Sequence, residues 1–244
     1  MIIKELEGKN IAIVAMGESQ LDFHLSLIHS NVYDEVWGIN CMGAITKCDR
    51  VFMLDPVSRF MDTDDAGTQT GIMRRWLPKA DCPIYTCELD DRCPSAVLYP
   101  LEEVAQATDC AYLNNTVPYA FAFALYNKVK SLNLFGIDFS YKGNIHFAEA
   151  GRACCEFWLA KCIEAGMIIN VAPRSGLLDT NSPLEERIYG YHRLDDPDIL
   201  IIDSEGTYRQ VKLSWYNDKL KEEQLKNITE IRTVIDGPPE AKRY

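Results

Sequence analysis

The sequence predicts an α/β fold in which a mostly parallel sheet carries helices on both faces. Three observations lead to this prediction. Short, continuous apolar runs such as residues 10–15 recur through the first three quarters of the chain, which is typical of strands buried on both faces. Helix-like stretches separate these runs, and a Gly, Asn, Asp or Pro lies at the end of most of them. This alternation indicates βαβ units and therefore a parallel sheet.

The elements follow one another along the chain at short intervals. Strands are predicted at residues 10–15, 35–40, 50–55, 83–87, 131–136 and 167–171. Helices are predicted at residues 20–29, 72–77, 101–108, 119–130 and 148–165. A mobile loop is predicted from residue 57 to the start of the helix at 72–77. Asn115 and Thr116 just before Pro118 are typical of a helix start, and Gly166 is typical of a helix end.

The character of the chain changes after Pro183. Residues 198–203 and 207–211, joined by a Ser-Glu-Gly turn, predict a β-hairpin. Residues 213–234 predict a charged amphipathic helix that ends before a Gly-Pro-Pro segment. We therefore divide the chain into an α/β domain, residues 1–182, and a small C-terminal hairpin-and-helix appendage, residues 183–244. A helix in such an appendage suits a homodimer contact.

Composition and charge exclude several classes of protein. With 47% hydrophobic residues in a chain of 244, the protein can bury a large core, so global disorder is excluded. The net charge of −11 argues against broad binding to nucleic acid or to anionic lipid. The start of the sequence has no signal-peptide pattern, and no apolar run approaches the roughly 20 residues of a membrane span. The nine cysteines lack disulfide or zinc spacing, so we expect reduced thiols, a cytoplasmic protein and no structural metal.

Polar motifs follow the first three predicted strands. Ligands of open parallel sheets bind outside the carboxyl ends of the strands, where Gly17-Glu18-Ser19, Asn40 and Asp55 all lie. The glycine loop can present N–H groups to an anion, and it can equally be an ordinary turn with Ser19 as helix cap. Asn40 suits a ribose or base edge, or a left-handed turn. Asp55 could bind Mg²⁺, accept a proton or cap a turn.

Two later motifs lie at the same predicted edge of the sheet. Asn115 and Thr116 precede an apolar helix whose start faces that edge, although capping alone also explains them. The segment Gly136-Ile137-Asp138-Phe139 ends a strand, and His146 follows it in a predicted loop before the helix at 148–165. Histidine is the side chain best suited to take a proton near pH 7, so His146 is a candidate general base or, alternatively, a cap of the next helix.

Taken in order, these motifs resemble the Rossmann-like family that includes the bacterial sialyltransferases of glycosyltransferase family 42. They are also similar to the archaeal 6-hydroxymethylpterin diphosphokinase-like proteins. The resemblance covers residues 11–181, and its most specific part is the Gly136-Ile137-Asp138 element with the following His146. The family's first loop usually reads Gly-x-Gly-Pro-Ser, whereas Glu18 replaces the proline here and would repel a nearby phosphate.

The resemblance to the sialyltransferases implies a nucleotide-sugar site, with a CMP-sugar favoured, and a general base. The nucleotide-binding residues that it implies, together with the two from its most specific segment, are Gly17, Ser19, Asn40, Asn115, Thr116, Gly136 and Asp138. The implied general base is His146. Asp55 is a second catalytic candidate, which rests only on its position at the end of the third predicted strand. Tyr119 and Tyr141 are candidates to steady the leaving phosphate.

Three functions remain open at this point. The first is an inverting glycosyltransferase that moves a sugar from a nucleotide to a glycan or small-molecule acceptor. The second is a phosphoryl transferase in which Asp55, with or without Asp138, holds Mg²⁺. The third is a nucleotide-binding protein that kept the fold without catalysis, which Glu18 favours. The fold alone does not decide among them.

Overall fold

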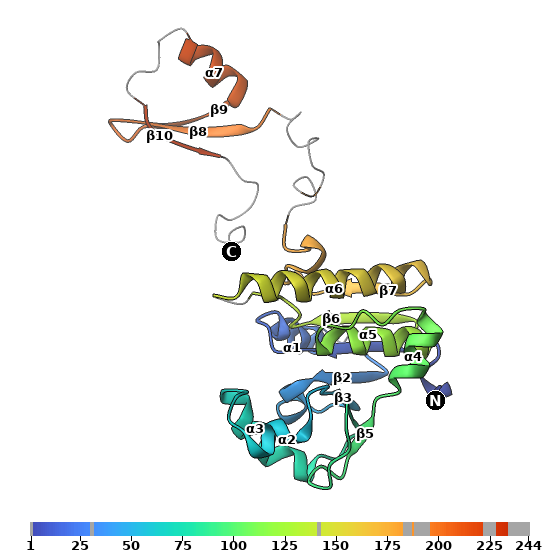
Figure 1. The fold of residues 1–244 in the computed structure, drawn as a ribbon. Coiled ribbons are helices and arrows are strands. Elements are labelled where there is room, and N and C mark those ends of the chain that lie inside the picture. The colour runs from blue at the N-terminus through green and yellow to red at the C-terminus, as the bar shows by residue number, and fades with distance from the viewer. Residues whose placement is uncertain are drawn as a thin grey trace. The chain divides into compact units, whose positions relative to one another are not determined.

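The computed structural model describes residues 2–29, 32–140, 143–182, 187, 196–221 and 228–233. The chain forms two compact units, Met1–Asn181 and Ser182–Tyr244 (Figure 1). The first unit is built on a seven-stranded, wholly parallel sheet with the order β5-β4-β3-β2-β1-β6-β7. Its strands are β1 (Asn10–Val14), β2 (Glu35–Ile39), β3 (Arg50–Phe52), β4 (Ile84–Thr86), β5 (Ala96–Leu98), β6 (Ser131–Phe135) and β7 (Ile168–Val171).

Helices cover both faces of this sheet, as predicted. On one face lie α4 (Leu101–Thr108), α5 (Thr116–Tyr126) and α6 (Ile145–Glu164), which pack on alternate strand residues such as Ile13 and Leu134. On the other face lie α1 (Gln20–Ile28), α2 (Val57–Asp62) and α3 (Thr68–Trp76), which pack on the intervening residues such as Val14 and Val51. Because successive residues of a strand pack on opposite, equally buried faces, the strands read as continuous apolar runs. The fold class is therefore Rossmann-like α/β.

The strand order reverses beside β1. The chain places β1 centrally, moves outward through β2, β3 and β4 to β5, and then crosses back to pair β6 with the free edge of β1. The register runs from Asn10 opposite Ser131 to Val14 opposite Phe135. The carboxyl ends of β1 and β6 therefore lie side by side at a topological switch point, where ligands of such sheets bind.

Two glycines allow the loops after β1 and β6 to meet. Gly136 has a φ of +70°, and a Cβ there would overlap the carbonyl oxygen of Ala15. A Cβ on Gly17 would overlap the Asp138 carboxylate. The Gly17 N–H donates to the Gly136 carbonyl oxygen at 2.8 Å. Any larger residue at either position would push the two loops apart.

Two sequence predictions between β3 and β5 need correction. Residues 57–71, predicted as a loop, contain α2 and the first four residues of the nine-residue α3, because Val57 and Phe60 bury one face of the first helix completely or nearly so. That burial outweighs the cost of the acids and glycines that suggested a loop. Strand β5 was not predicted, because it is a three-residue strand at the sheet edge, with Val97 and Leu98 exposed, and forms no long apolar run.

The second unit contains a three-stranded antiparallel sheet with the order β10-β8-β9. Its elements are β8 (Asp198–Asp203), β9 (Tyr208–Lys212), α7 (Leu213–Lys221) and β10 (Ile228–Thr233). The predicted hairpin is present as β8 and β9. The helix predicted at 213–234 is wrong beyond α7: residues 228–233 form a strand, because their β-branched residues pair with β8. Residues 222–227 and 234 of that prediction lie outside the described residues.

The cysteines behave as small hydrophobic residues. All nine are free thiols, and most are buried. Burial raises the pKa of the Cys162 thiol to about 12 and, with the nearby Cys82, that of Cys48 also to about 12. Such thiols stay protonated and unreactive near neutral pH. Within the described part of the chain, no helix combines the length and the apolar character that a membrane crossing requires.

The close approach of the two loops gives the first prediction. Gly136→Ala combines a strained positive φ with an overlap on Ala15, so it should lower the free energy of unfolding by about 2–4 kcal/mol. Chemical denaturation followed by circular dichroism measures this loss. Gly71→Ala is the matched control, because Gly71 lies inside α3 with only Arg75 nearby. That variant should be neutral or slightly stabilising, and equal losses in both variants would contradict the proposed overlap.

Candidate functional site

A cavity of about 610 Å³ lies at the switch point. The ends of β1, β2, β3 and β6, the start of α5 and parts of α2 and α3 supply its walls. The lining brings together these sequence-predicted site residues: Gly17, Asn40, Asp55, Asn115, Thr116, Gly136 and Asp138. Ser19 is buried and contacts the lining residue Asp138. His146 is absent from this lining.

The Asp138 carboxylate holds the β1–α1 loop in place. Its Oδ2 accepts the Ser19 N–H at 2.8 Å, and its Oδ1 accepts the Ser19 hydroxyl. The same hydroxyl oxygen accepts the Gly136 N–H at 2.8 Å. Asp138 therefore fills the position at the start of α1 where the sequence suggested that a phosphate could bind, and Ser19 ties the ends of β1 and β6 together.

Asn40 presents an unused acceptor to the cavity. It begins a short 3₁₀ segment, Asn40–Ala44, with a φ of +51°, so the left-handed turn considered for it is present. Its Oδ1 is buried and has no hydrogen-bond partner among the described residues. A buried acceptor without a donor costs about 1–3 kcal/mol, which a ligand N–H or O–H would recover. Asn40 therefore forms the left-handed turn and also offers a candidate hydrogen-bond acceptor to a ligand.

Asn115 and Thr116 place the start of α5 in the cavity wall. The Asn115 side chain caps the helix by accepting the Val117 N–H at 3.1 Å, as the simpler interpretation predicted. Its amide also donates to Asn114 Oδ1 at 2.8 Å, and Asn114 in turn donates to the Ala150 carbonyl oxygen of α6 at 2.9 Å. These bonds join α5 to α6, and Thr116 at the start of α5 lines the cavity.

Asp55 is paired with a residue that sequence reasoning missed. Arg59 Nη1 donates to Asp55 Oδ1 at 2.6 Å, and Arg59 Nε donates to Asp65 Oδ1 at 3.1 Å. The hydrogen bond to Asp55, and then that to Asp65, raise the pKa of the Arg59 guanidinium. The spacing of four residues after Asp55 was the available signal, but the segment was expected to be a loop. Gln69, Phe139, Ser140 and Phe147 also line the cavity without having been predicted.

His146 does not lie in the predicted loop. It is the second residue of α6, which begins earlier than expected because Asn144 caps it by accepting the Phe147 N–H at 3.2 Å. The imidazole is fully exposed, with Nδ1 3.9 Å from Glu149 Oε2. Its neighbour Phe147 does line the cavity, so His146 belongs to the outer rim. Of the two tyrosine candidates, Tyr119 packs against Tyr99 with the ring centroids 5.0 Å apart. Tyr141 lies outside the described residues.

Most of the charged groups of the lining are already engaged by other residues. Its charged residues are Glu18, Asp55, Arg59 and Asp138. Asp55 is neutralised by Arg59 and Asp138 is bound to Ser19, which leaves the exposed Glu18 as the carboxylate that a ligand would meet first. Within the described residues, no group of three His, Cys, Asp or Glu side chains is arranged to hold a metal ion.

Fold and site together define an α/β protein with a polar ligand cavity at the switch point of its parallel sheet. No protein-family model matches the chain, and no curated protein matches it in sequence. Among solved structures, the chain is similar to the sialyltransferase CstII from Campylobacter jejuni, which was solved in complex with the substrate analogue CMP-3FNeuAc. The two chains are 17% identical with a TM-score of 0.46, over 69% of this chain and 83% of that chain. No family or curated match supports the resemblance to the pterin diphosphokinase-like proteins.

The bonds of Asp138 give the second prediction. Asp138→Ala leaves the Ser19 N–H and hydroxyl without an acceptor, so the free energy of unfolding should fall by about 2–3 kcal/mol. The vacated start of α1 would then accept an external anion. Sulfate or phosphate should therefore raise the melting temperature of Asp138→Ala more than that of the wild type. An equal response of both proteins to sulfate, measured against chloride at matched ionic strength, would contradict the assigned role.

Proposed function

We propose that this protein is a nucleotide-dependent transferase, and specifically a sialyltransferase-like inverting glycosyltransferase that uses a nucleotide-sugar. One observation carries the proposal: a 610 Å³ cavity at the switch point is lined by Asn40, whose buried Oδ1 has no partner among the described residues, and by Thr116 at the start of α5. A nucleoside offers complementary donors, because ribose hydroxyls and the amino group of cytosine both donate hydrogen bonds. The resemblance of the motifs favours a CMP-sugar within this class.

The electrostatics of the cavity favour glycosyl transfer over phosphoryl transfer. A phosphoryl transferase would need the start of α1 to cradle a di- or triphosphate, but the Asp138 carboxylate occupies that position and Glu18 flanks it. A nucleoside monophosphate-sugar carries less charge and can direct its phosphate toward the start of α5 at Thr116 instead.

The cavity does not suit Mg²⁺ as a resident cofactor. The oxygen ligands proposed from the sequence were Asp55 and Asp138, and both are committed elsewhere, to Arg59 and to Ser19. A cation held there would have to displace these partners. The proposed reaction therefore includes no step at a metal ion.

In the proposed reaction, a hydroxyl of a glycan or small-molecule acceptor attacks the anomeric carbon of the donor sugar. The new carbon–oxygen bond forms as the bond from that carbon to the nucleotide phosphate breaks, with inversion, and a base takes the hydroxyl proton. We propose His146 as this base because its place at the rim, beside Phe147, suits an acceptor that approaches from solvent. N–H and hydroxyl groups near the leaving phosphate would stabilise its charge.

A second candidate function has an observation in its favour. His146 is fully exposed and outside the cavity lining, and its Nδ1 lies 3.9 Å from Glu149 Oε2. A nucleotide-binding protein without catalysis would be consistent with that position. The two candidates differ in turnover and agree on nucleotide binding, so they are separable by experiment. The homodimer contact suggested for the C-terminal unit stays a prediction.

Nucleotide binding is tested with a thermal-shift panel of CMP, UDP, GDP and adenine nucleotides, each with and without Mg²⁺. We expect CMP to stabilise the protein in the absence of Mg²⁺, by about 2.7 kcal/mol at 100 times its Kd. Thr116→Val removes one hydroxyl at similar volume and should weaken binding about fivefold. Stabilisation that requires Mg²⁺ would instead favour phosphoryl transfer, and no stabilisation by any nucleotide would refute the proposed site.

The role of His146 is tested by substitution. His146→Ala should lower the rate of sugar transfer from CMP-sialic acid by about 10²- to 10⁴-fold, while the Kd for CMP stays unchanged because the imidazole is outside the cavity. Glu149→Gln, which removes only its 3.9 Å neighbour, is the control and should keep most activity. Transfer at the wild-type rate in His146→Ala would contradict the assignment, and absence of turnover in the wild-type protein would favour the non-catalytic candidate.

A further inference from the structure

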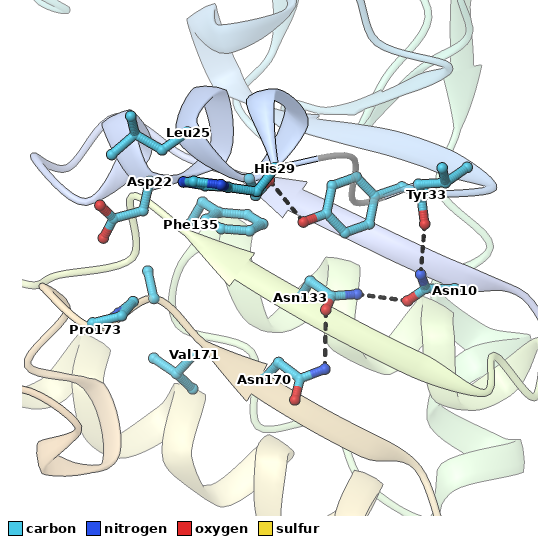
Figure 2. Close-up of a pocket in the computed structure, with 13 residues that line it drawn as sticks. Asn10, Asp22, Leu25, His29, Tyr33, Asn133, Phe135, Asn170, Val171 and Pro173 are labelled. Atoms are coloured by element: carbon cyan, nitrogen blue, oxygen red, sulfur yellow. Dashed lines mark hydrogen bonds between the residues drawn. The ribbon is translucent and has the colours of Figure 1, made fainter.

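A second cavity, of about 590 Å³, lies on the face of the sheet that carries α1. It shares no lining residue with the candidate site. Figure 2 shows its floor on β6 and β7, with side chains of α1 along one side. Helix α1 packs against Phe135 on this floor, but it leaves Asn170 on the outermost strand exposed. The cavity is therefore an open groove beside α1.

A chain of asparagine amides crosses the floor of this groove (Figure 2). Asn170 Nδ2 donates to Asn133 Oδ1 at 2.9 Å, and Asn133 Nδ2 donates to Asn10 Oδ1 at 2.6 Å. Asn10 Nδ2 then donates to the Val32 carbonyl oxygen at 2.9 Å. Asparagine is depleted in strands, and a face meant for a covering helix would carry apolar side chains. Three linked amides on adjacent strands therefore mark this floor as a polar binding surface.

The direction of these bonds determines what the floor offers. The Val32 carbonyl can only accept, so it fixes the orientation of Asn10 and, through it, those of Asn133 and Asn170. The chain ends at Asn170 Oδ1, an acceptor on an exposed residue at the open side of the groove. Aligned amide hydrogen bonds polarise one another and strengthen that terminal acceptor. A ligand that binds there should donate.

A second acceptor lies at the other end of the groove. Asp22 lines it, and its Oδ2 is buried with no hydrogen-bond partner among the described residues. The other oxygen, Oδ1, is 3.3 Å from Arg174 Nε. Because Arg174 balances the charge of Asp22, the groove needs donors and no net positive charge. Its remaining titratable lining side chains are His29 and Tyr33.

The rest of the groove is apolar. Leu25 and Val32 line it and are 44% and 80% exposed, and Phe135 lies in its floor (Figure 2). A suitable ligand is thus neutral, rich in hydrogen-bond donors and apolar on one face. Pyranose sugars combine these properties, because their hydroxyls project from the ring edge and their C–H groups form an apolar face.

We propose that this groove is a saccharide-binding site, separate from the cavity at the switch point. Sugar hydroxyls donate to Asn170 Oδ1 and Asp22 Oδ2, and the C–H face of a ring packs against Leu25 and Val32. The site needs no transfer reaction elsewhere in the chain, so it does not depend on the proposed function. If the protein does transfer sugars, the groove would hold a distant part of a glycan acceptor.

The test follows the side-chain NH₂ signals of Asn10, Asn133 and Asn170 by ¹⁵N NMR during titration with lactose and with maltose. We expect at least one disaccharide to shift the Asn133 and Asn170 signals with saturation. Asn170→Leu, at an exposed position, should weaken that binding about fivefold to tenfold, as should Asp22→Asn. Asn217→Leu makes the same change in α7, outside both cavities, and should bind like the wild type.

Three outcomes would overturn the proposal. They are the absence of shifts with either sugar, equal affinity in Asn170→Leu and wild type, and shifts produced by ethylammonium but by neither sugar, which would indicate a cation site. CMP is titrated into the same sample as a separate readout. Failure of CMP binding with saccharide binding retained removes the proposed function alone, and the reverse result removes the groove alone.

Discussion

The hydrogen bonds between Asp138 and Ser19 are the interaction on which the site depends. They join the loop after β1 to the segment after β6, two parts of the chain that are 119 residues apart. Gly17 and Gly136 let these segments approach, and the Ser19 hydroxyl passes the connection on to the Gly136 N–H. Without this contact the two central strands would still pair, but the cavity between their ends would lose its inner wall.

The same interaction decides how charge is distributed in the cavity. A protein of net charge −11 is a poor host for an anion, and a carboxylate at the start of α1 makes that loop poorer still. The negative charge of two carboxylates in the cavity is offset by their partners. Asp55 is paired with Arg59, and Asp138 accepts hydrogen bonds from N–H and O–H donors. Glu18 alone stays uncommitted among the carboxylates of the lining, as far as the structure describes the chain. The cavity is consequently best matched to ligands that are recognised through neutral polar groups.

Local patterns predicted most of the sheet, because each buried strand is a run of apolar residues that can be recognised on its own. They failed where burial or pairing with distant residues decides the outcome. Residues 57–62 form a helix because Phe60 packs into a core, and residues 228–233 form a strand because they pair with β8. Neither fact is visible in the local sequence.

The candidate site shows the same division. Position after a strand sufficed to predict that Gly17, Asn40, Asp55 and Asp138 would meet, because parallel strands end at one edge of the sheet. What each side chain does there could not be predicted. Asp138 accepts hydrogen bonds from Ser19, and Arg59 forms an ion pair with Asp55. Both contacts depend on where α1 and α2 begin. His146 was assigned to a loop because the capping bond from Asn144, which extends α6, has a weak sequence signal.

The central place of β1 has a consequence for how the chain is made. Its two neighbours differ greatly in sequence distance: β2 follows within about one helix, whereas Asn10 meets Ser131 across 121 residues. During synthesis one edge of β1 therefore stays unpaired until more than half of the chain has emerged. Long-range strand pairing is slow to form, and exposed edges are prone to aggregation in the meantime. We infer that the β1–β6 ladder forms late in folding, and that the cavity at the switch point comes into existence only when it does.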